Sequence, residues 1–155
     1  MNIELRQRPP ARVATRRYTG PFGEPLARYW RTDIAPWLAA NELIDCPRYG
    51  VALDNPATTP AELCRYDCCV ALPPGVSLAG APETTIAGGA YAIACFKGTG
   101  AAIGAAWNDF LSSCVARGYA FDATRSAFEH YPRGTSYDTK TGVFGCELCL
   151  PVHGE

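Results

Sequence analysis

The chain has 155 residues, a length that favours a single domain over residues 1–155. Hydrophobic residues make up 48% of it and charged residues 19%, a balance typical of a folded protein and not of a disordered one. The net charge of −1 gives no overall field that would attract DNA or an anionic membrane, so we expect direct binding to neither. No apolar run approaches the roughly 18 residues of a membrane span, and the N-terminal sequence lacks the apolar core of a signal peptide. We therefore expect a cytoplasmic protein.

The first half of the chain predicts strands over residues 3–8 and 12–18, then a helix, then strands over 49–53 and 66–72. A proline-glycine run follows and opens a linker, expected over residues 74–84. The helix is indicated by apolar residues at helical spacing. These are Leu26, Trp30, Ile34, Trp37 and Leu38.

The second half of the chain predicts strands over residues 89–96, 127–131 and 143–150. A second apolar stripe at helical spacing lies between the first two of these strands, and Gly118 is a natural C-terminal cap for that helix. The stripe consists of Ile103, Trp107, Phe110, Leu111, Cys114 and Val115.

The two halves repeat each other at an offset near 78 residues. Trp30 aligns with Trp107, and residues 70–73 align with residues 148–151. Few residues are identical, so a chance alignment of common residues is the alternative explanation. The repeat divides the chain at about residues 1–73 and 85–152 and predicts an α+β fold, in which tandem βαββ units form one antiparallel sheet with two helices. A ligand cleft is expected between the halves.

Eight cysteines are the most unusual part of the composition. Cys146 and Cys149 form a Cys-x-x-Cys pattern, but residues three apart on a strand face opposite sides and cannot share a metal ion or a disulfide without a bulge. The chain also has only two histidines. We therefore expect no metal site and no cofactor, and we interpret the cysteines as small buried apolar residues.

Glu129 is the most interesting carboxylate, because it lies on a predicted strand between Phe128 and His130. Strand alternation places its side chain on the face of Tyr131 and opposite to Phe128 and His130. Glu129 could lie at the bottom of an apolar pocket with a raised pKa, or it could be an ordinary solvated carboxylate. The spacing alone favours the solvated carboxylate.

Arginines are concentrated at the start of the chain. Residues 1–31 hold seven arginines against two glutamates, and Arg6 and Arg8 share one strand face. This edge could meet an acidic protein partner or nucleic acid. The alternative, which we favour, is a solvated strand face that discourages edge-to-edge pairing, because no recognition helix accompanies it.

Six short segments, taken in order, resemble those of a known family. They lie at residues 50–56, 64–70, 88–92, 96–98, 128–131 and 147–152. Together they resemble the GyrI-like domains, also known as the effector-binding domains of AraC-type regulators. The resemblance implies a tandem βαββ fold whose cleft binds small, often aromatic or cationic compounds, and it places Glu129 in that cleft. No helix-turn-helix domain is expected beside it.

The resemblance also suggests which residues line the cleft around Glu129. One departure from the family is Cys149, which stands where an aromatic residue is common. The other candidate lining residues are aromatic: Tyr49, Tyr66, Tyr91, Trp107 and Tyr131.

Three functions follow from the resemblance. The first is a stand-alone small-molecule-binding protein that takes lipophilic, aromatic or cationic compounds, in regulator-like sensing or in protection from a toxin or drug. The second is a hydrolase of cyclopropane-bearing genotoxic compounds, with Glu129 as general base. The third is an interaction protein whose arginine-rich edge meets DNA gyrase or a separate regulator.

Overall fold

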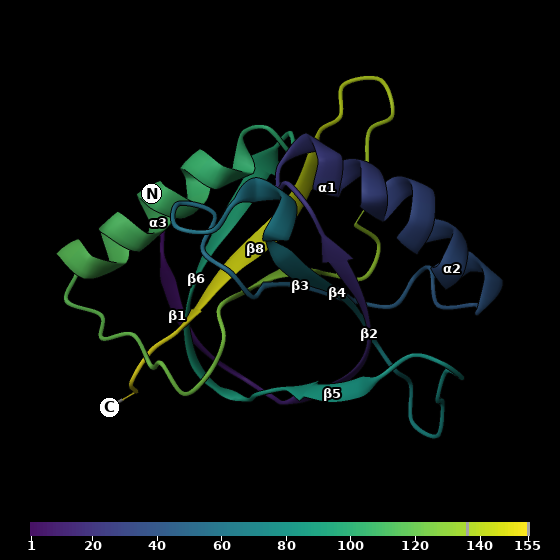
Figure 1. Cartoon of the computed structure of the whole chain (residues 1–155). Coiled ribbons are helices and arrows are strands. Elements are labelled where there is room, and N and C mark those ends of the chain that lie inside the picture. The colour runs from purple at the N-terminus through teal and green to yellow at the C-terminus, as the bar shows by residue number, and fades with distance from the viewer. Residues whose placement is uncertain (136, 155) are drawn as a thin grey trace.

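The structure, a computed structural model, describes residues 1–135 and 137–154 of the chain. In this part of the chain, eight strands form one antiparallel sheet, in the order β1-β6-β8-β7-β3-β4-β2-β5 (Figure 1). The strands are β1 (Glu4–Arg8), β2 (Ala11–Thr19), β3 (Arg48–Ala52), β4 (Arg65–Ala71), β5 (Glu83–Ile86), β6 (Gly89–Gly98), β7 (Phe128–Tyr131) and β8 (Phe144–Pro151). The helical segments are α1 (Glu24–Tyr29), η1 (Trp30–Ile34), α2 (Ala35–Ala40), η2 (Ala61–Leu63) and α3 (Ile103–Ala116).

The sheet order confirms the predicted α+β fold. The first half contributes β3, β4 and β2, and the second half contributes β6, β8 and β7. The two halves meet where β3 pairs with β7, which we call the seam. The long helices of both halves, α1 to α2 and α3, lie on the same side of the sheet (Figure 1).

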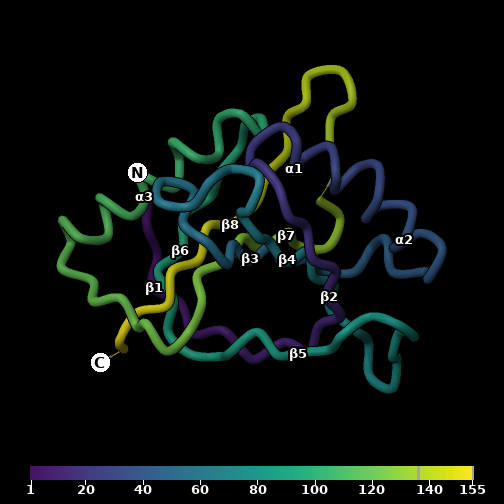
Figure 2. Tube along the Cα trace, in the orientation of Figure 1, coloured from purple at the N-terminus to yellow at the C-terminus, as the bar shows by residue number. Residues whose placement is uncertain are grey.

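Two strands lie outside the predicted βαββ plan, and they link the halves. β1 belongs to the first half but pairs with β6 of the second, while β5 leads into the second half but pairs with β2 of the first. β5 begins at Glu83, within the segment expected to be a linker. Its residues are mostly exposed and polar, so backbone pairing with the edge of β2, and not burial of side chains, stabilises this strand. The resulting ribbon curls the sheet below the helices (Figure 2).

The first helix is interrupted by a π-helical segment, η1, directly before Pro36 of α2. A proline ring clashes with the carbonyl four residues earlier and has no N–H to donate, so a regular α-helix cannot run through this point. The wider turn of η1 accommodates the proline, and the sequence stripe alone did not predict it. The last turn of the composite helix is capped by Asn41, whose side chain donates to the Trp37 carbonyl.

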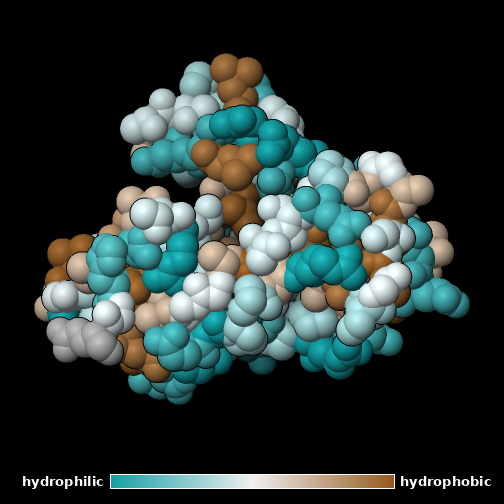
Figure 3. Space-filling model, turned by 90° about the horizontal axis from the view of Figure 1, so that it is seen from below, coloured by the Kyte–Doolittle hydropathy of each residue, from teal (hydrophilic) through white to brown (hydrophobic). Residues whose placement is uncertain are grey.

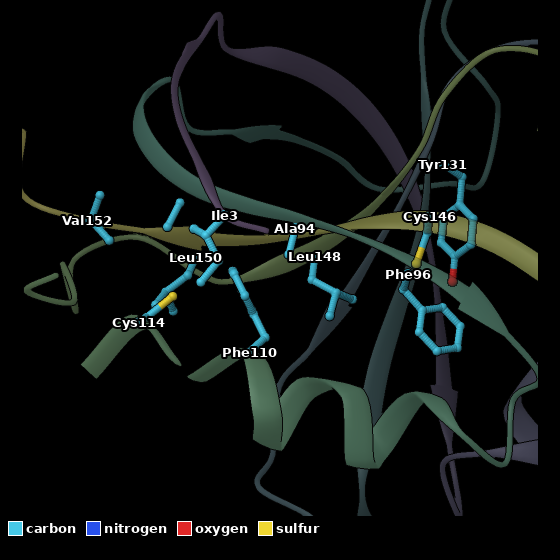
Figure 4. Packing of buried hydrophobic residues seen from close by; sticks show 11 residues of the cluster. Ile3, Ala94, Phe96, Phe110, Cys114, Tyr131, Cys146, Leu148, Leu150 and Val152 are labelled. Atoms are coloured by element: carbon cyan, nitrogen blue, oxygen red, sulfur yellow. The ribbon is translucent and has the colours of Figure 1, made fainter. Parts of the chain in front are cut away.

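Apolar residues fill both faces of the curled sheet. Between α3 and the sheet lies one cluster, which includes Phe110, Cys114, Cys146 and Leu148 (Figure 4). A second cluster lies under the first helix, and a third lies on the opposite face of the sheet around Phe128. The buried members of this third cluster are at most 7% exposed, so the cluster forms no apolar surface patch. Seen from below, the surface is mostly hydrophilic with scattered hydrophobic residues (Figure 3).

Most of the cysteines are part of these clusters, as predicted. Six of the eight are buried, whereas Cys95 on β6 is exposed and Cys46 is partly exposed. Burial raises the pKa of both Cys69 and Cys149 to about 12. These thiols therefore stay protonated and pack as small apolar groups.

Within the described residues, no helix is long and apolar enough to cross a membrane.

Candidate functional site

Glu129 lies on β7, at the seam, and its side chain faces the helices. Only 8% of the residue is exposed, which makes it the one buried charged residue of the described chain. The expectation of a solvated carboxylate, drawn from spacing alone, is therefore wrong. A buried carboxylate is stable only when its oxygens accept hydrogen bonds, so its surroundings decide what it can do.

Three donors from three elements meet the Glu129 carboxylate. The Tyr66 hydroxyl on β4 donates to Oε1 at 2.5 Å, and the Tyr131 hydroxyl on β7 donates to the same oxygen at 3.2 Å. The Trp107 indole on α3 donates from Nε1 to Oε2 at 2.8 Å. Both halves of the chain contribute, so this cluster, which we call the Glu129 cluster, exists only when the seam is closed.

Gly50 allows Tyr66 to reach the carboxylate. β3 lies between β4 and β7, and Gly50 of β3 pairs with Glu129 on one side and with Cys68 on the other. A Cβ at position 50 would overlap the Tyr66 hydroxyl and ring. Glycine inside a strand typically marks such a close approach, so this residue carried a usable signal that the sequence reasoning missed.

The electrostatics of the Glu129 cluster combine one acid with three neutral donors. Burial raises the pKa of Glu129, and the hydrogen bonds from Tyr66, Trp107 and Tyr131 oppose this by stabilising the charged form. Burial and the nearby carboxylate hold the pKa values of Tyr66 and Tyr131 well above the usual tyrosine value. Both phenols therefore remain protonated and act as donors.

Trp30 of η1 covers the Glu129 cluster from the first helix. Its ring stands edge-on to Tyr66, with centroids 6.3 Å apart, and tilts against Tyr131 at 5.4 Å. Trp30 and Trp107 occupy equivalent places in the repeat, and the structure gives them different tasks. Trp107 donates to the carboxylate, whereas Trp30 packs against the two tyrosines that donate to it.

A cavity of about 110 Å³ lies beside this cluster, on the outer side of Tyr131, and we call it the seam pocket. It is bounded by the first helix, β3, β7 and the segment that leads into β8. Glu129 is not among its described lining residues, but Tyr131, which donates to Glu129, is one of them. The walls are mainly aromatic with two basic residues: Trp30, Tyr131, Tyr137, Phe144, Arg31 and Arg48.

A larger and more open depression, of about 710 Å³, lies between β1, β6 and α3. Exposed polar residues such as Glu4 and Asp109 contribute to its walls, and no predicted site residue lines it. Because small-molecule sites are typically concave and apolar with few polar groups, the smaller seam pocket is the better candidate despite its size.

A family profile described as the GyrI-like small molecule binding domain matches residues 1–153 of this chain. The chain belongs to this family. It is 26% identical over 159 residues to a protein of Citrobacter koseri named DNA gyrase inhibitor, with 100% of both chains covered. A protein of Escherichia coli with the same name is 27% identical over 156 residues, covering 98% of this chain and 97% of its own.

Solved structures share the fold of this GyrI-like domain. The structure of SAV2435 bound to tetraphenylphosphonium has a TM-score of 0.68 at 16% identity and covers 99% of this chain and 95% of its own. The crystal structure of the EcmrR C-terminal domain has a TM-score of 0.70 at 13% identity, with 99% and 98% covered.

Three predicted lining residues of this GyrI-like domain lie away from Glu129. Tyr49, Tyr91 and Cys149 belong to the cluster around Phe128, on the opposite face of the sheet. Tyr49 and Tyr91 pack edge-on against the Phe128 ring at 5.6 and 5.2 Å. The structure therefore brings Tyr66, Trp107 and Tyr131 to Glu129 and leaves these three outside the site. Cys146, and not Cys149, is the cysteine that packs with Tyr131 on the helix side of the sheet.

The two arginines predicted to share a face of the basic edge are engaged within the domain. Arg6 contacts Glu147 at 2.7 Å and Arg8 contacts it at 3.6 Å, while His130 lies 2.7 Å from the same carboxylate. These contacts lower the pKa of Glu147 to about 2, chiefly through the His130 hydrogen bond. This group lies on the face opposite to the Glu129 cluster.

Proposed function

We propose that this GyrI-like domain binds small aromatic or lipophilic compounds in the seam pocket, in regulator-like sensing or in protection from a toxin or drug. One observation carries the proposal. Tyr131 presents one side to the pocket and donates its hydroxyl to the buried Glu129. The carboxylate thus fixes an aromatic wall in place before any ligand arrives, and preorganised walls of this kind favour binding.

The aromatic walls favour a flat ligand over a flexible one. Trp30, Tyr137 and Phe144 offer ring faces and edges at different angles, and aromatic pairs gain about 0.5–1.5 kcal/mol beyond the area they bury. A lipophilic cation such as the tetraphenylphosphonium bound to SAV2435 is much larger than the seam pocket. To meet Glu129 directly, a cation would have to displace Trp30.

The experiment titrates the protein with phenol, 4-methylphenol and tetraphenylphosphonium by isothermal calorimetry. We expect Trp30→Ala to weaken the binding of the two neutral aromatic compounds by about tenfold, the loss of roughly 1.4 kcal/mol. Trp37→Ala is the matched control, since Trp37 lies on the same composite helix, outside the pocket and against Arg16. Equal losses in both variants, or no binding of any compound to the unaltered protein, would count against the proposal.

Hydrolysis with Glu129 as general base is less well supported. A general base must hold a water or substrate proton within hydrogen-bond reach. Oε1 already accepts from Tyr66 and Tyr131, and Oε2 accepts from Trp107. The raised pKa of Glu129 suits a base. Because both carboxylate oxygens already accept hydrogen bonds from within the domain, we propose binding without turnover.

Inhibition of DNA gyrase is a second candidate, because relatives that match this chain over their whole length carry that name. The arginine-rich edge offers less support, since Arg6 and Arg8 are paired with Glu147. A supercoiling assay with purified gyrase tests it directly. Unchanged supercoiling at a large molar excess of this protein would exclude the candidate.

A further inference from the structure

The seam pocket is basic. Among its described lining residues are two arginines, Arg31 and Arg48, and no aspartate or glutamate. The described chain gives neither arginine a salt bridge. Guanidinium groups at an apolar site are usually paired with a carboxylate. Two arginines without an acidic partner therefore indicate that the ligand supplies the negative charge.

Arg48 is the more constrained of the two. Its Nη2 donates to the Thr135 carbonyl at 3.0 Å, and its guanidinium lies over the Tyr131 ring, 5.7 Å from the centroid. Its Nε is buried and has no hydrogen-bond partner among the described residues. Burial also lowers the pKa of this guanidinium, which reflects the lack of a compensating acid. A negatively charged group in the pocket would offset the cost of burying this guanidinium.

Arg31 approaches the same pocket from the first helix. Its Nη1 donates to the Tyr137 hydroxyl at 2.5 Å, and its guanidinium stacks over the Tyr137 ring at 4.5 Å from the centroid. Stacking on an aromatic face leaves the other edges of a guanidinium fork open to an acceptor. The pocket therefore has aromatic walls with a positive charge on each of two opposing elements, the first helix and β3.

Arg48 and Glu129 occupy corresponding places in the two halves, one on each side of the seam. Arg48 pairs with Val70 across β3 and β4, and Glu129 pairs with Leu148 across β7 and β8. Val70 and Leu148 correspond in the repeat, so Arg48 occupies in the first half the place that Glu129 occupies in the second. Tyr131 lies between the two charges, with its hydroxyl on Glu129 and its ring under Arg48.

We propose that the seam pocket selects a single-ring aromatic compound that carries a carboxylate, with the ring among Trp30, Tyr131 and Phe144 and the carboxylate on Arg48 and Arg31. This inference rests on the proposed function and adds the charge of the ligand. The seam pocket, at about 110 Å³, is smaller than the roughly 150 Å³ cavity that accommodates benzene, so it takes no more than a single ring and leaves the carboxylate at its mouth. A planar carboxylate matches the fork of a guanidinium with two parallel hydrogen bonds.

The test uses three ligands of nearly the same shape that differ in charge: benzoate, benzamide and benzamidinium. Ligand-observed NMR titrations of the unaltered protein measure their dissociation constants at one ionic strength. We expect benzoate to bind at least tenfold more tightly than benzamide, and benzamidinium to bind most weakly. Equal affinity for benzamide, or tighter binding of benzamidinium, overturns the proposed charge selection while leaving aromatic binding intact. Binding of none of the three overturns the charge selection, and the calorimetric titrations with the compounds named above then test the proposed function separately.

A pair of variants assigns the effect to the pocket. We expect Arg48→Met to weaken the benzoate preference over benzamide severalfold, because methionine keeps the apolar stem and removes one of the two charges that hold the carboxylate. Arg28→Met is the matched control, since Arg28 is exposed on the first helix and does not line the pocket. A benzoate preference that is undiminished in Arg48→Met, or that falls equally in Arg28→Met, contradicts the assignment. The charge series on the unaltered protein remains decisive if Arg48→Met does not fold.

Discussion

At the residue scale, the Glu129 cluster depends on the lack of a Cβ atom at position 50. Gly50 has no side chain, and through the space this leaves the Tyr66 hydroxyl crosses β3 to reach the carboxylate. Burying an acid without its donors would be far more costly than burying it with them, so the glycine and the glutamate work as a unit. The consequence is that a single methyl group at position 50 should disturb the site.

We predict that Gly50→Ala destabilises the protein by about 2–3 kcal/mol, because the new Cβ forces Tyr66 away and leaves the buried Glu129 short of a donor. Urea denaturation monitored by circular dichroism measures the change. Gly104→Ala is the control: Gly104 lies on α3, where a Cβ meets nothing within 4 Å, and alanine favours a helix over glycine by up to about 1 kcal/mol. Equal stability of Gly50→Ala and the unaltered protein would contradict the role assigned to Gly50.

Sequence reasoning identified the members of the Glu129 cluster but not all of its surroundings. Strand alternation placed Glu129 and Tyr131 on one face of β7, and the structure agrees. Alternation within one strand does not fix the faces of another, because that requires the pairing between strands. For this reason the sequence does not show that Tyr49, Tyr91 and Cys149 lie on the face opposite to Glu129. The sequence gives no sign that Arg48 lines the seam pocket, because a lone arginine on a strand is usually exposed.

At the element scale, periodicity predicted seven of the eight described strands and both long helices, and it missed β5, η1 and η2. β2, β4, β6 and β8 and both helices have apolar patterns of their own, and all were expected close to their observed ranges. β5 has no such pattern, and its strand conformation comes from pairing with β2. η1 was missed for a similar reason: the apolar stripe of the first helix continues through it, and only the position of Pro36 shows that the helix must widen.

The element β1 is held to the domain by charge as well as by pairing. Its burial pattern is almost wholly exposed, but Arg6 and Arg8 both contact Glu147 on β8, which also meets His130 on β7. One carboxylate thus connects three strands. Since the pKa of Glu147 is lowered to about 2, below its unfolded value of about 4.3, its stabilising contribution is present above the unfolded value and is lost as the pH falls toward 2.

We predict that the unaltered protein loses on the order of 2 kcal/mol of unfolding free energy between pH 5 and pH 2 through this group, and that Glu147→Gln loses correspondingly less over the same range. Urea denaturation at several pH values in this range measures both. Glu62→Gln serves as the control, since Glu62 is exposed and makes no salt bridge among the described residues. Parallel profiles of unfolding free energy against pH for Glu147→Gln and the unaltered protein would show that the contacts of Glu147 with Arg6, Arg8 and His130 do not stabilise the fold.

At the scale of the whole molecule, the repeat does not divide the protein into two independent parts. The halves exchange their leading strands, since β1 pairs with β6 and β5 pairs with β2. They also share core residues: Ile3 of the first half is buried among residues of the second, and Trp30 packs against the clusters of both halves. The Glu129 cluster and the seam pocket both take side chains from each half, so the site is a product of their joining.

We therefore predict that neither half folds alone and that the two halves fold together when mixed. Fragments 1–78 and 79–155, divided between the exposed turns at Gly75 and Gly80, keep every strand intact. Each fragment alone would expose one face of its sheet and leave Glu129 or its partner Tyr66 unpaired, which a unit of this size cannot offset. Circular dichroism should show disordered chains for each fragment and a cooperative, concentration-dependent transition for the equimolar mixture. Cooperative unfolding of fragment 79–155 alone would mean that the exchanged strands and the Glu129 cluster are not needed for folding, because that fragment lacks β1, β2, Gly50 and Tyr66.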